Sequence, residues 1–383
     1  MSWSIPDLEK AEFFDRFLRA DTPWLEALRG CPQDPIHHAE GDVLTHTGMV
    51  CRALVDLPAF QNSPAQDQQI LAWAALLHDI AKPECNLTDS VGRISSPGHA
   101  LKGSFRARRL LWDLDCPFDL REEIVGLIAH HMTPTWALER DDPTRLVRKI
   151  SLDCRCALLA ILVEADIRGR VCADAADLLE RLELFRELAK EANVEDQPAR
   201  FASDSARYLY FQNRWHVPDQ APFDDFRCKV VMLSGLPGAG KDTWISRHLA
   251  DWPVISLDKI RDSMGVAPTA PQGAVIDAAR AQARDYLRAR QNFVWNATNI
   301  TGQVRAKALS LFFDYGAQVE IVYLEAPRAR LFEQNRQREA VVPQAVLQRL
   351  VAKWELPRPS EAHSVVYHSQ SPQNGNSKRR QRV

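Results

Sequence analysis

The feature that most constrains the fold of this 383-residue chain is the glycine-rich turn Gly-Leu-Pro-Gly-Ala-Gly-Lys at residues 235–241. It follows a short β-branched run, Lys229 to Ser234, and precedes a helical pattern that begins near Thr243. A strand, a G-x-x-x-x-G-K turn and a helix in this order are typical of a phosphate-binding loop. Backbone N–H groups and the helix N-terminus surround nucleotide phosphates in such a loop, and its lysine reaches the β and γ oxygens.

The residues that we expect to bind the nucleotide lie in this turn and directly after it. They are Gly235, Gly238, Ala239, Gly240, Lys241, Asp242 and Thr243. Asp242 departs from the pattern, because Ser or Thr usually ligates Mg²⁺ at that position. Its carboxylate can hold the ion directly or through water, or it can simply be a carboxylate that the helix dipole favours. The expected cofactor of this site is Mg²⁺ with ATP or another nucleoside triphosphate.

The sequence around the loop predicts a parallel sheet covered by helices over residues 228–368. Short apolar runs at 293–295 and 319–324 alternate with longer helical stretches, which is the pattern of βαβ units. The segment before this domain, 201–227, is rich in Pro, Asp, Gln and aromatic residues and is expected to be a linker. Residues 369–383 are polar and basic, and we expect a disordered tail there.

Four charged residues in this half suggest phosphoryl transfer. Asp258 and Arg261 lie three residues apart and can share one face, where Asp258 would act as general base on a hydroxyl and Arg261 would bind the acceptor phosphate. The alternative is an exposed ion pair. Arg338, together with Arg336, can form part of a lid that neutralises charge on the transferring phosphate. The alternative for this segment is a solvated basic face.

The first half of the chain has a different chemistry. Seven of the eleven histidines lie between residues 37 and 131. Apolar residues in this half recur at spacings of three and four, and strand signals are scarce. We expect helices at 70–80, 105–114, 122–132, 157–167 and 174–193. Residues 1–200 are therefore predicted to form an all-helical domain, which makes the whole chain a multidomain α and α/β protein.

Imidazoles and carboxylates of this helical domain suggest a metal site. The candidate ligands are His46, His78, Asp79, His99, His131 and Asp166. A mixed set of nitrogen and oxygen ligands suits a divalent cation such as Mn²⁺, Co²⁺ or Ni²⁺. The number of histidines permits a second ion, with Asp79 bridging the two. Adjacent helix residues point about 100° apart, so only one of His130 and His131 can face the site, and we choose His131.

Other polar residues of the same half lie close to these candidates in the sequence. His38 and Glu40 can orient a ligand or a substrate phosphate, or they can simply cap the turn that follows them. Lys82, Arg106 and Arg109 can bind substrate phosphates, or they can be surface charge on amphipathic helices.

Residues 228–365 resemble the polynucleotide kinase branch of P-loop phosphotransferases. The likeness is carried by the phosphate loop, the D-x-x-R of Asp258 and Arg261, the segment 296–299 and the R-x-R-x-x-x-V-P segment that contains Arg338. It implies that Asp258 activates a 5′-hydroxyl, that Arg261 contacts the 3′-phosphate of the terminal nucleotide and that Arg338 contacts the donor phosphates. Asn296 stands where these relatives often have Asp, so a carboxylate role does not carry over to it.

Residues 30–175 resemble the HD phosphohydrolase superfamily, particularly the HD segment attached to CCA-adding enzymes. The motifs H-x-E-G-D-V-x-x-H-T, L-L-H-D-I-x-K-P and G-H carry this likeness. The nucleotidyltransferase head of those enzymes is missing, so CCA addition is not implied. The two halves together resemble the bacterial bifunctional RNA end-healing enzymes of the HD-Pnk type.

The HD-Pnk resemblance implies two reactions on one broken strand. The HD half would remove a 2′,3′-cyclic phosphate, or a 2′- or 3′-phosphate, and the other half would phosphorylate a 5′-hydroxyl with a nucleoside triphosphate. The implied partners are RNA or DNA ends, and an RNA ligase acting downstream. Two other functions stay open: an HD nucleotidase joined to a small-molecule kinase, and a nucleotide-sensing regulator whose HD half binds its ligand without hydrolysing it.

The charge and hydropathy of the chain bear on its partners and location. The formal net charge of −2 gives no global attraction to nucleic acid, so phosphate binding must come from local basic clusters. The sequence has no apolar run near the roughly 20 residues that cross a bilayer, and no signal-peptide core. We therefore expect a cytoplasmic protein with no membrane partner.

Overall fold

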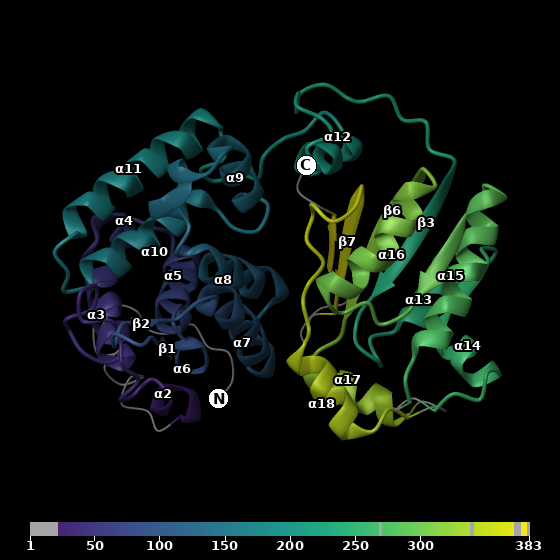
Figure 1. Ribbon diagram of the computed structural model, residues 1–383, viewed down its shortest axis with the longest axis horizontal. Coiled ribbons are helices and arrows are strands. Elements are labelled where there is room, and N and C mark those ends of the chain that lie inside the picture. The colour runs from purple at the N-terminus through teal and green to yellow at the C-terminus, as the bar shows by residue number, and fades with distance from the viewer. Residues whose placement is uncertain (1–21, 268–269, 338–340, 371–376, 381–383) are drawn as a thin grey trace. The chain divides into compact units, whose positions relative to one another are not determined.

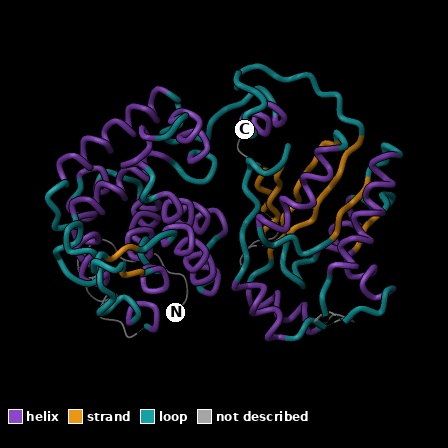
Figure 2. The backbone as a smooth tube through the Cα atoms, viewed as in Figure 1, coloured by secondary structure: helices purple, strands orange, loops and turns teal. Residues whose placement is uncertain are grey.

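The computed structural model describes residues 22–267, 270–337, 341–370 and 377–380. The chain divides into two compact units, Met1–Ala199 (unit 1) and Arg200–Val383 (unit 2). Figures 1 and 2 show helices throughout unit 1 and a sheet with helices in unit 2. The fold class expected from the sequence, helical followed by α/β with a parallel sheet, is therefore confirmed.

Unit 1 is a bundle built around one central helix. Its long helices are α3 (Val43–Asp56), α5 (Ala65–Leu77), α7 (His99–Asp113), α8 (Phe118–His130), α10 (Cys156–Arg168) and α11 (Ala175–Glu191). Nine of the thirteen residues of α5 are buried, because α3, α8 and α10 all pack against it. A helix that is apolar on all sides belongs in the middle of a bundle. The residues that follow its C-terminus, His78 and Asp79, are therefore held in the interior.

Shorter elements complete unit 1. They are α2 (Pro23–Glu26), α4 (Pro58–Gln61), α6 (Lys82–Cys85), the 3₁₀ helix η1 (Pro134–Glu139) and α9 (Pro143–Ile150). A small antiparallel pair, β1 (Leu87–Thr88) and β2 (Ile94–Ser95), adds two strands to a domain that we expected to be all-helical. Each strand has only two residues, which is too short for a period of two to be visible in the sequence.

Unit 2 contains a six-stranded sheet in the order β4-β5-β3-β6-β7-β8. The strands are β3 (Cys228–Ser234), β4 (Val254–Ser256), β5 (Phe293–Asn296), β6 (Ala317–Glu325), β7 (Ser364–Ser369) and β8 (Ser377–Arg380). The first five in that spatial order are parallel, and β8 pairs antiparallel with β7. The central strand β3 is almost entirely buried, as expected for a sheet covered on both faces. Its carboxyl end leads directly into the glycine-rich loop.

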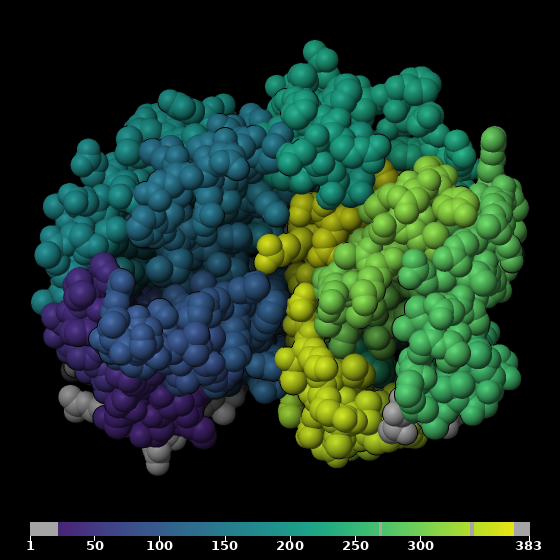
Figure 3. All heavy atoms as spheres, viewed as in Figure 1, coloured from purple at the N-terminus to yellow at the C-terminus, as the bar shows by residue number. Residues whose placement is uncertain are grey.

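The helices of unit 2 connect and cover these strands (Figure 1). They are α12 (Asp204–Phe211), α13 (Lys241–His248), α14 (Leu257–Ser263), α15 (Gly273–Arg288), α16 (Gly302–Asp314), α17 (Arg328–Arg336) and α18 (Gln344–Ala352). The last two lie at the surface of unit 2 (Figure 3). Only Leu331, Asn335 and Leu347 are buried among their described side chains.

Two segments differ from the sequence expectations. Residues 201–227 are not a free linker: Ser203 caps α12, Arg207 donates to the carbonyl oxygen of His363 at 2.6 Å, and the ring of Tyr208 lies 4.6 Å from that of His363. This segment therefore belongs to unit 2. The expectation of a disordered tail over residues 369–383 is wrong for Ser369, which ends β7, and for residues 377–380, which form β8, whereas residues 371–376 and 381–383 lie outside the described residues. Backbone hydrogen bonds along the edge of β7 order the β8 segment, and its polar composition does not encode them.

Within the part of the chain that the structure describes, no helix combines the length and the hydropathy needed to cross a bilayer.

Candidate metal centre and nucleotide site

Six buried histidine and aspartate side chains from five segments meet inside unit 1. They are His46 on α3, His78 and Asp79 at the end of α5, His99 at the start of α7, His131 at the end of α8 and Asp166 on α10. One ligand atom each of His46, His78 and Asp79 lies within 4.8 Å of the others, and the same holds for Asp79, His99 and His131. The structure thus brings together all six residues that the sequence analysis selected as ligands.

The ends of the helices orient three of these imidazoles. Nδ1 of His78 donates to the carbonyl oxygen of Ala75 at 2.8 Å, and Nδ1 of His131 donates to that of Ile128 at 2.8 Å. Nδ1 of His99 donates in the same way to Ser96 at 2.7 Å. A carbonyl oxygen can only accept, so each Nδ1 carries a hydrogen and each neutral ring keeps a lone pair on Nε2. This is the tautomer that binds a metal through Nε2.

The Nε2 atoms face one another in two pairs. Nε2 of His46 lies 3.3 Å from Nε2 of His78, and Nε2 of His99 lies 3.2 Å from Nε2 of His131. Two facing lone pairs repel each other unless a proton or a cation lies between them. Two nitrogens bound to one ion at about 2.0–2.1 Å and at ligand angles near 90–110° are about 2.9–3.4 Å apart. Both separations therefore fit a shared metal ion.

The carboxylate of Asp79 lies between the two pairs. Its Oδ2 is 3.2 Å from Nε2 of His78 and 3.7 Å from Nε2 of His46, whereas its Oδ1 is 3.3 Å from Nε2 of His99 and 3.9 Å from Nε2 of His131. Among the described residues neither oxygen accepts a well-formed hydrogen bond, although Nζ of Lys82 lies 2.7 Å from Oδ2. One aspartate thus offers one oxygen to each pair of imidazoles, which is the arrangement of a bridging ligand.

Asp166 completes the first of these two groups. Its Oδ1 lies 3.0 Å from Nε2 of His46, and its carboxylate also pairs with the guanidinium of Arg170. Glu40 holds the other side of the His46 ring, with Oε1 2.9 Å from Nδ1 of His46, while its Oε2 accepts from the backbone N–H of Val171 at 2.9 Å. Carboxylates of this kind orient ligating imidazoles and raise their basicity.

The electrostatics of the cluster favour the protonation states that a cation needs at Asp79 and His131, whereas at His78 the carboxylates of Asp79 and Asp166 outweigh burial and raise the pKa of the imidazole. Burial alone would raise the pKa of Asp79, but the neighbouring His78 and Lys82 outweigh it and hold that pKa well below the usual range. Burial lowers the pKa of His131 to about 3, and the positive charge that neighbouring histidines can carry adds to this effect. At neutral pH the carboxylate is therefore charged and the imidazole of His131 is neutral.

The adjacent histidines of α8 provide a matched test of the metal centre. Nε2 of His130 lies 2.9 Å from Oδ2 of Asp153 and belongs to neither imidazole pair, whereas His131 faces His99. We expect His131→Asn to weaken metal binding by about 10–100-fold or more, and His130→Asn to leave it unchanged. Metal content after dialysis against Mn²⁺, measured by mass spectrometry, checks this. Equal metal content in the two variants would mean that His131 is not a ligand.

The glycine-rich loop of unit 2 is shaped by close backbone contacts. Gly235, Gly238 and Gly240 have φ angles of 152°, 86° and 90°, which L-amino acids with a side chain rarely adopt. A Cβ at position 235 would lie 2.4 Å from the carbonyl oxygen of Leu324. Nζ of Lys241 donates to the carbonyl oxygens of Gly235 at 2.8 Å and Leu236 at 3.0 Å, so it lies over the loop.

Gly235→Ala is therefore expected to distort the loop. The strained φ angle and the clash with Leu324 should destabilise unit 2 by about 1–3 kcal/mol and weaken nucleotide binding. Thermal unfolding and a fluorescent-nucleotide titration measure the two effects. Gly273→Ala is the control, because a Cβ at that position meets nothing within 4 Å. If the two variants behave alike, the loop does not require the glycine.

Residues after β5 fasten the loop to the sheet. Gly235 N–H donates to the carbonyl oxygen of Thr298 at 2.9 Å, and Nδ2 of Asn299 donates to that of Leu233 at 2.7 Å. The guanidinium of Arg305, which is almost fully buried, donates to the carbonyl oxygen of Asn299 at 3.0 Å and pairs with Glu361 at 2.6 Å. The Asn-Ala-Thr-Asn segment therefore links the loop strand to the ion pair of Arg305 and Glu361, which we call the clamp.

The candidates for acceptor chemistry lie on α14, which Ser256 caps. Nη2 of Arg261 lies 2.7 Å from Oδ1 of Asp258, so the two side chains share one face, as the spacing predicted. The Asp258 side chain is 61% exposed and can be reached by a substrate hydroxyl. Arg338 lies outside the described residues. Of the loop residues, Lys241, Asp242 and Thr243 open α13.

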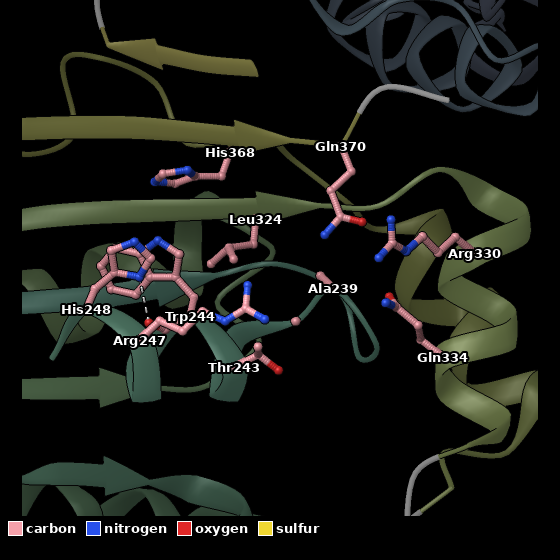
Figure 4. A pocket seen from close by; sticks show the side chains of 11 residues that line it. Ala239, Thr243, Trp244, Arg247, His248, Leu324, Arg330, Gln334, His368 and Gln370 are labelled. Carbon is pink, nitrogen blue, oxygen red and sulfur yellow. Dashed lines mark hydrogen bonds between the residues drawn. The ribbon is translucent and has the colours of Figure 1, made fainter. Parts of the chain in front are cut away.

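A pocket beside the loop contains residues that the sequence analysis did not select (Figure 4). The ring of Trp244 stacks on that of His248, with centroids 4.6 Å apart and planes 16° apart. The Gln334 amide lies across the pocket from these rings. It is oriented to donate to the carbonyl oxygen of Gly238 at 2.6 Å and to accept from Nε of Arg330 at 3.3 Å. Ala239 in the loop and Thr243 directly after it also line this pocket, so the pocket lies next to the expected phosphate site. Its flat rings and amide groups suit a nucleoside.

Comparisons with known proteins match parts of the chain. Residues 230–357 match the sequence profile of a family described as an AAA domain. The chain is 35% identical over 161 residues to the multifunctional CCA protein of Halorhodospira halophila, a match that covers 40% of this chain and 36% of that protein. It is 31% identical over 176 residues to the protein of the same name from Xanthomonas campestris pv. campestris, covering 44% and 40%. The chain spans about two fifths of the length of these relatives.

Solved structures of kinases are also similar to the chain. A putative kinase from Chloroflexus aurantiacus matches with a TM-score of 0.33 and 14% identity, over 39% of this chain and 88% of that one. A gluconokinase from Sinorhizobium meliloti matches with a TM-score of 0.28 and 18% identity, over 39% and 86%. The family match, the loop geometry and the parallel sheet together make unit 2 a P-loop domain with a mainly parallel sheet.

Proposed function

We propose that the chain is a bifunctional RNA end-healing enzyme. Unit 2 phosphorylates 5′-hydroxyl ends with a nucleoside triphosphate, and unit 1 removes 2′,3′-cyclic, 2′- or 3′-phosphates with the help of divalent metal ions. The observation that carries the proposal is the pair of facing imidazole couples on either side of Asp79, in a chain that also contains a phosphate loop.

The residues of unit 1 fit two metal ions. His46, His78 and Asp166 together with Oδ2 of Asp79 would hold one ion, and His99, His131 and Oδ1 of Asp79 would hold the other. Such ions, when bound, activate water and neutralise the charge that develops on a phosphate during displacement. The buried carbonyl and carboxylate partners of the imidazoles keep the Nε2 lone pairs directed inward, so the protein does not have to reorganise as charge develops.

Lys82 lies beside this centre and has a role that follows from its contacts. Its ammonium is buried and lies 2.7 Å from both Oδ2 of Asp79 and Oε1 of Gln33. A cation held at that position attracts a substrate phosphate toward the bridging carboxylate without itself ligating metal. In the absence of metal it also offsets the negative charge of Asp79.

In unit 2 the roles follow the order of phosphoryl transfer. The loop N–H groups and Lys241 bind the donor phosphates, and the pocket with Trp244 receives the nucleoside. Asp258 accepts the proton of the 5′-hydroxyl, and Arg261, already held 2.7 Å from that carboxylate, contacts the acceptor's phosphate. Arg338 would contact the donor phosphates, as in the kinases that this half resembles.

The preference for RNA is supported by the helical half. That half resembles the HD segment of CCA-adding enzymes, and proteins named multifunctional CCA protein are similar to part of the chain. Hydrolysis of a 2′,3′-cyclic phosphate requires a 2′-oxygen, which DNA lacks. A ligase acting downstream would then join the two ends that this enzyme has repaired.

The test is an end-group assay on the whole protein. An RNA oligonucleotide with a 5′-hydroxyl and a 2′,3′-cyclic phosphate is incubated with ATP, Mg²⁺ and Mn²⁺, Co²⁺ or Ni²⁺, and its ends are analysed by mass spectrometry. We expect a gain of the 5′-phosphate and a loss of the 3′-terminal phosphate. Phosphorylation of free nucleosides alone would favour nucleotide metabolism. Tight nucleotide binding by unit 1 without hydrolysis would favour a sensor.

A further inference from the structure

The position after the phosphate-loop lysine and the end of the neighbouring strand carry unexpected side chains. In P-loop proteins a Ser or Thr hydroxyl follows the lysine and holds Mg²⁺ together with an aspartate at a strand end. Here Asp242 occupies the loop position and Asn296 occupies the end of β5. The site therefore still contains one carboxylate and one neutral oxygen donor, but their positions are exchanged.

The structure places these two side chains in direct contact. Nδ2 of Asn296 donates to Oδ1 of Asp242 at 2.7 Å. Asn296 is only 7% exposed, and its backbone is fixed by pairing of β5 with β3, where it lies beside Leu233. Asp242 lies in the first turn of α13, directly after Lys241, and its side chain is exposed toward solvent. A rigid amide thus orients a carboxylate that remains open to a ligand.

The hydrogen bond leaves most of the carboxylate available. An ionised aspartate has about four lone-pair positions, and the amide of Asn296 occupies one of them. Mg²⁺ prefers oxygen ligands and is usually held by one or two carboxylates together with substrate phosphates and water. Thr243, one residue later, lines the nucleoside pocket and is the other oxygen donor of this turn.

We propose that Asp242, oriented by Asn296, is the protein ligand of the Mg²⁺ that accompanies the nucleoside triphosphate. The inference rests on the proposed kinase function. In other P-loop proteins the carboxylate that holds the ion lies at the strand end, whereas here it would lie at the loop position, on Asp242. Asn296, at the strand end, is then a positioning residue. Asp242 then attracts nucleotide only through the ion, because without metal its negative charge faces the charged phosphates.

This charge arrangement predicts that the Asp242→Asn substitution changes nucleotide affinity in opposite directions with and without metal. Both changes are measured by binding and do not depend on turnover. For Asp242→Asn we expect the affinity for Mg²⁺·ATP to fall by about 10–100-fold, and the affinity for ATP in excess EDTA to rise by up to about tenfold. Asn296→Ala should lower the Mg²⁺·ATP affinity by about 10–100-fold without the rise in EDTA. Titration of a fluorescent ATP analogue with and without metal measures all four values.

The double variant Asp242→Thr with Asn296→Asp restores the usual P-loop arrangement, with a hydroxyl in the loop and a carboxylate at the strand end. Its recovery of affinity would show that the single variants did not lose affinity through misfolding. We expect it to recover most of the Mg²⁺-dependent affinity that the single variants lose. Electron paramagnetic resonance of bound Mn²⁺·ATP adds a direct readout, because the spectrum should change in Asp242→Asn. Asp251→Asn, which removes the same charge after α13, is the control and should match the unaltered chain.

Each outcome decides between distinct conclusions. Equal metal dependence in Asp242→Asn and the unaltered chain would overturn the proposal, as would loss of metal dependence in Thr243→Val alone. If the unaltered chain bound no nucleotide under either condition, the kinase function itself would fail. Normal kinase activity with an unchanged Asp242→Asn profile would reject only the role of Asp242.

Discussion

Asp79→Asn is expected to abolish phosphate removal while leaving 5′-phosphorylation intact. The substitution preserves the shape of the side chain but removes the charge that faces both pairs of imidazoles, at 3.2 Å and 3.3 Å from the nearest nitrogens. Loss of a bridging ligand should remove several kcal/mol of transition-state stabilisation, so activity should fall by at least about 10³-fold. The end-group assay and the metal content per chain are measured on the same preparation.

The controls for this variant address folding and separability. The neutral amide of Asp79→Asn would leave the ammonium of Lys82 without its anion, although Gln33 still accepts from it at 2.7 Å. A melting temperature close to that of the unaltered chain shows that unit 1 remains folded. Since the chain divides into two compact units and Asp79 lies in the first, 5′-phosphorylation by the second should not change. Parallel loss of both activities would show that the sites are not independent, and full phosphatase activity would reject the metal centre.

Lys241→Ala is expected to have the opposite effect: 5′-phosphorylation falls while phosphate removal stays intact. Nζ of Lys241 donates to the carbonyl oxygens of Gly235 and Leu236, and in the proposed kinase reaction the β and γ phosphates of ATP would accept from this ammonium instead. Removing one preorganised donor of this type costs about 10²–10³-fold, and the loss here should be at least that large. Transfer of labelled phosphate from ATP to a 5′-hydroxyl RNA measures it, with the phosphatase reaction as the internal control.

Asp258→Ala should reduce the same reaction for a different reason. Removal of a general base costs about 10²–10⁴-fold, so weak turnover should remain, and ATP binding should not change. Asp262→Ala is a matched control, because Asp262 is an exposed carboxylate on the same helix α14. If Asp258→Ala and Asp262→Ala retain similar activity, the pair formed by Asp258 and Arg261 is a surface ion pair and another residue accepts the proton.

Local patterns in the sequence predicted most of the framework. The apolar spacing of α5, α8 and α10 and the β-branched run of β3 are properties of neighbouring residues, and the structure has these elements with ends shifted by a few positions. Helical phase also indicated that only one of His130 and His131 can face the cluster, and the structure places His131 there. The contacts of Glu40 with His46 and Val171 could not be predicted, because they join residues up to 131 positions apart that share no periodicity.

The pocket beside the glycine-rich loop and the end of the sheet were missed for related reasons. Trp244 and His248 lie one helical turn apart, which could have indicated a common face, but nothing in the sequence places His368 or Gln370 beside them. Strand β7 contains the strand-forming residues Val365, Val366 and Tyr367, but its position beside β6 comes from pairing, and the polar strand β8 is recognisable only from its pairing with β7. Strand pairing is a long-range property, and a polar segment acquires it from an available edge.

The clamp around Arg305 has a consequence for dissecting the protein into working pieces. The family match ends at residue 357, and a fragment cut there would retain the phosphate loop, Asp258 and Arg305. It would lose Glu361, which neutralises the buried guanidinium, and all of β7. An orphaned buried charge costs about 3–5 kcal/mol, so the boundary of the smallest stable fragment of unit 2 is set by electrostatic neutrality inside the fold and lies beyond the last recognisable motif.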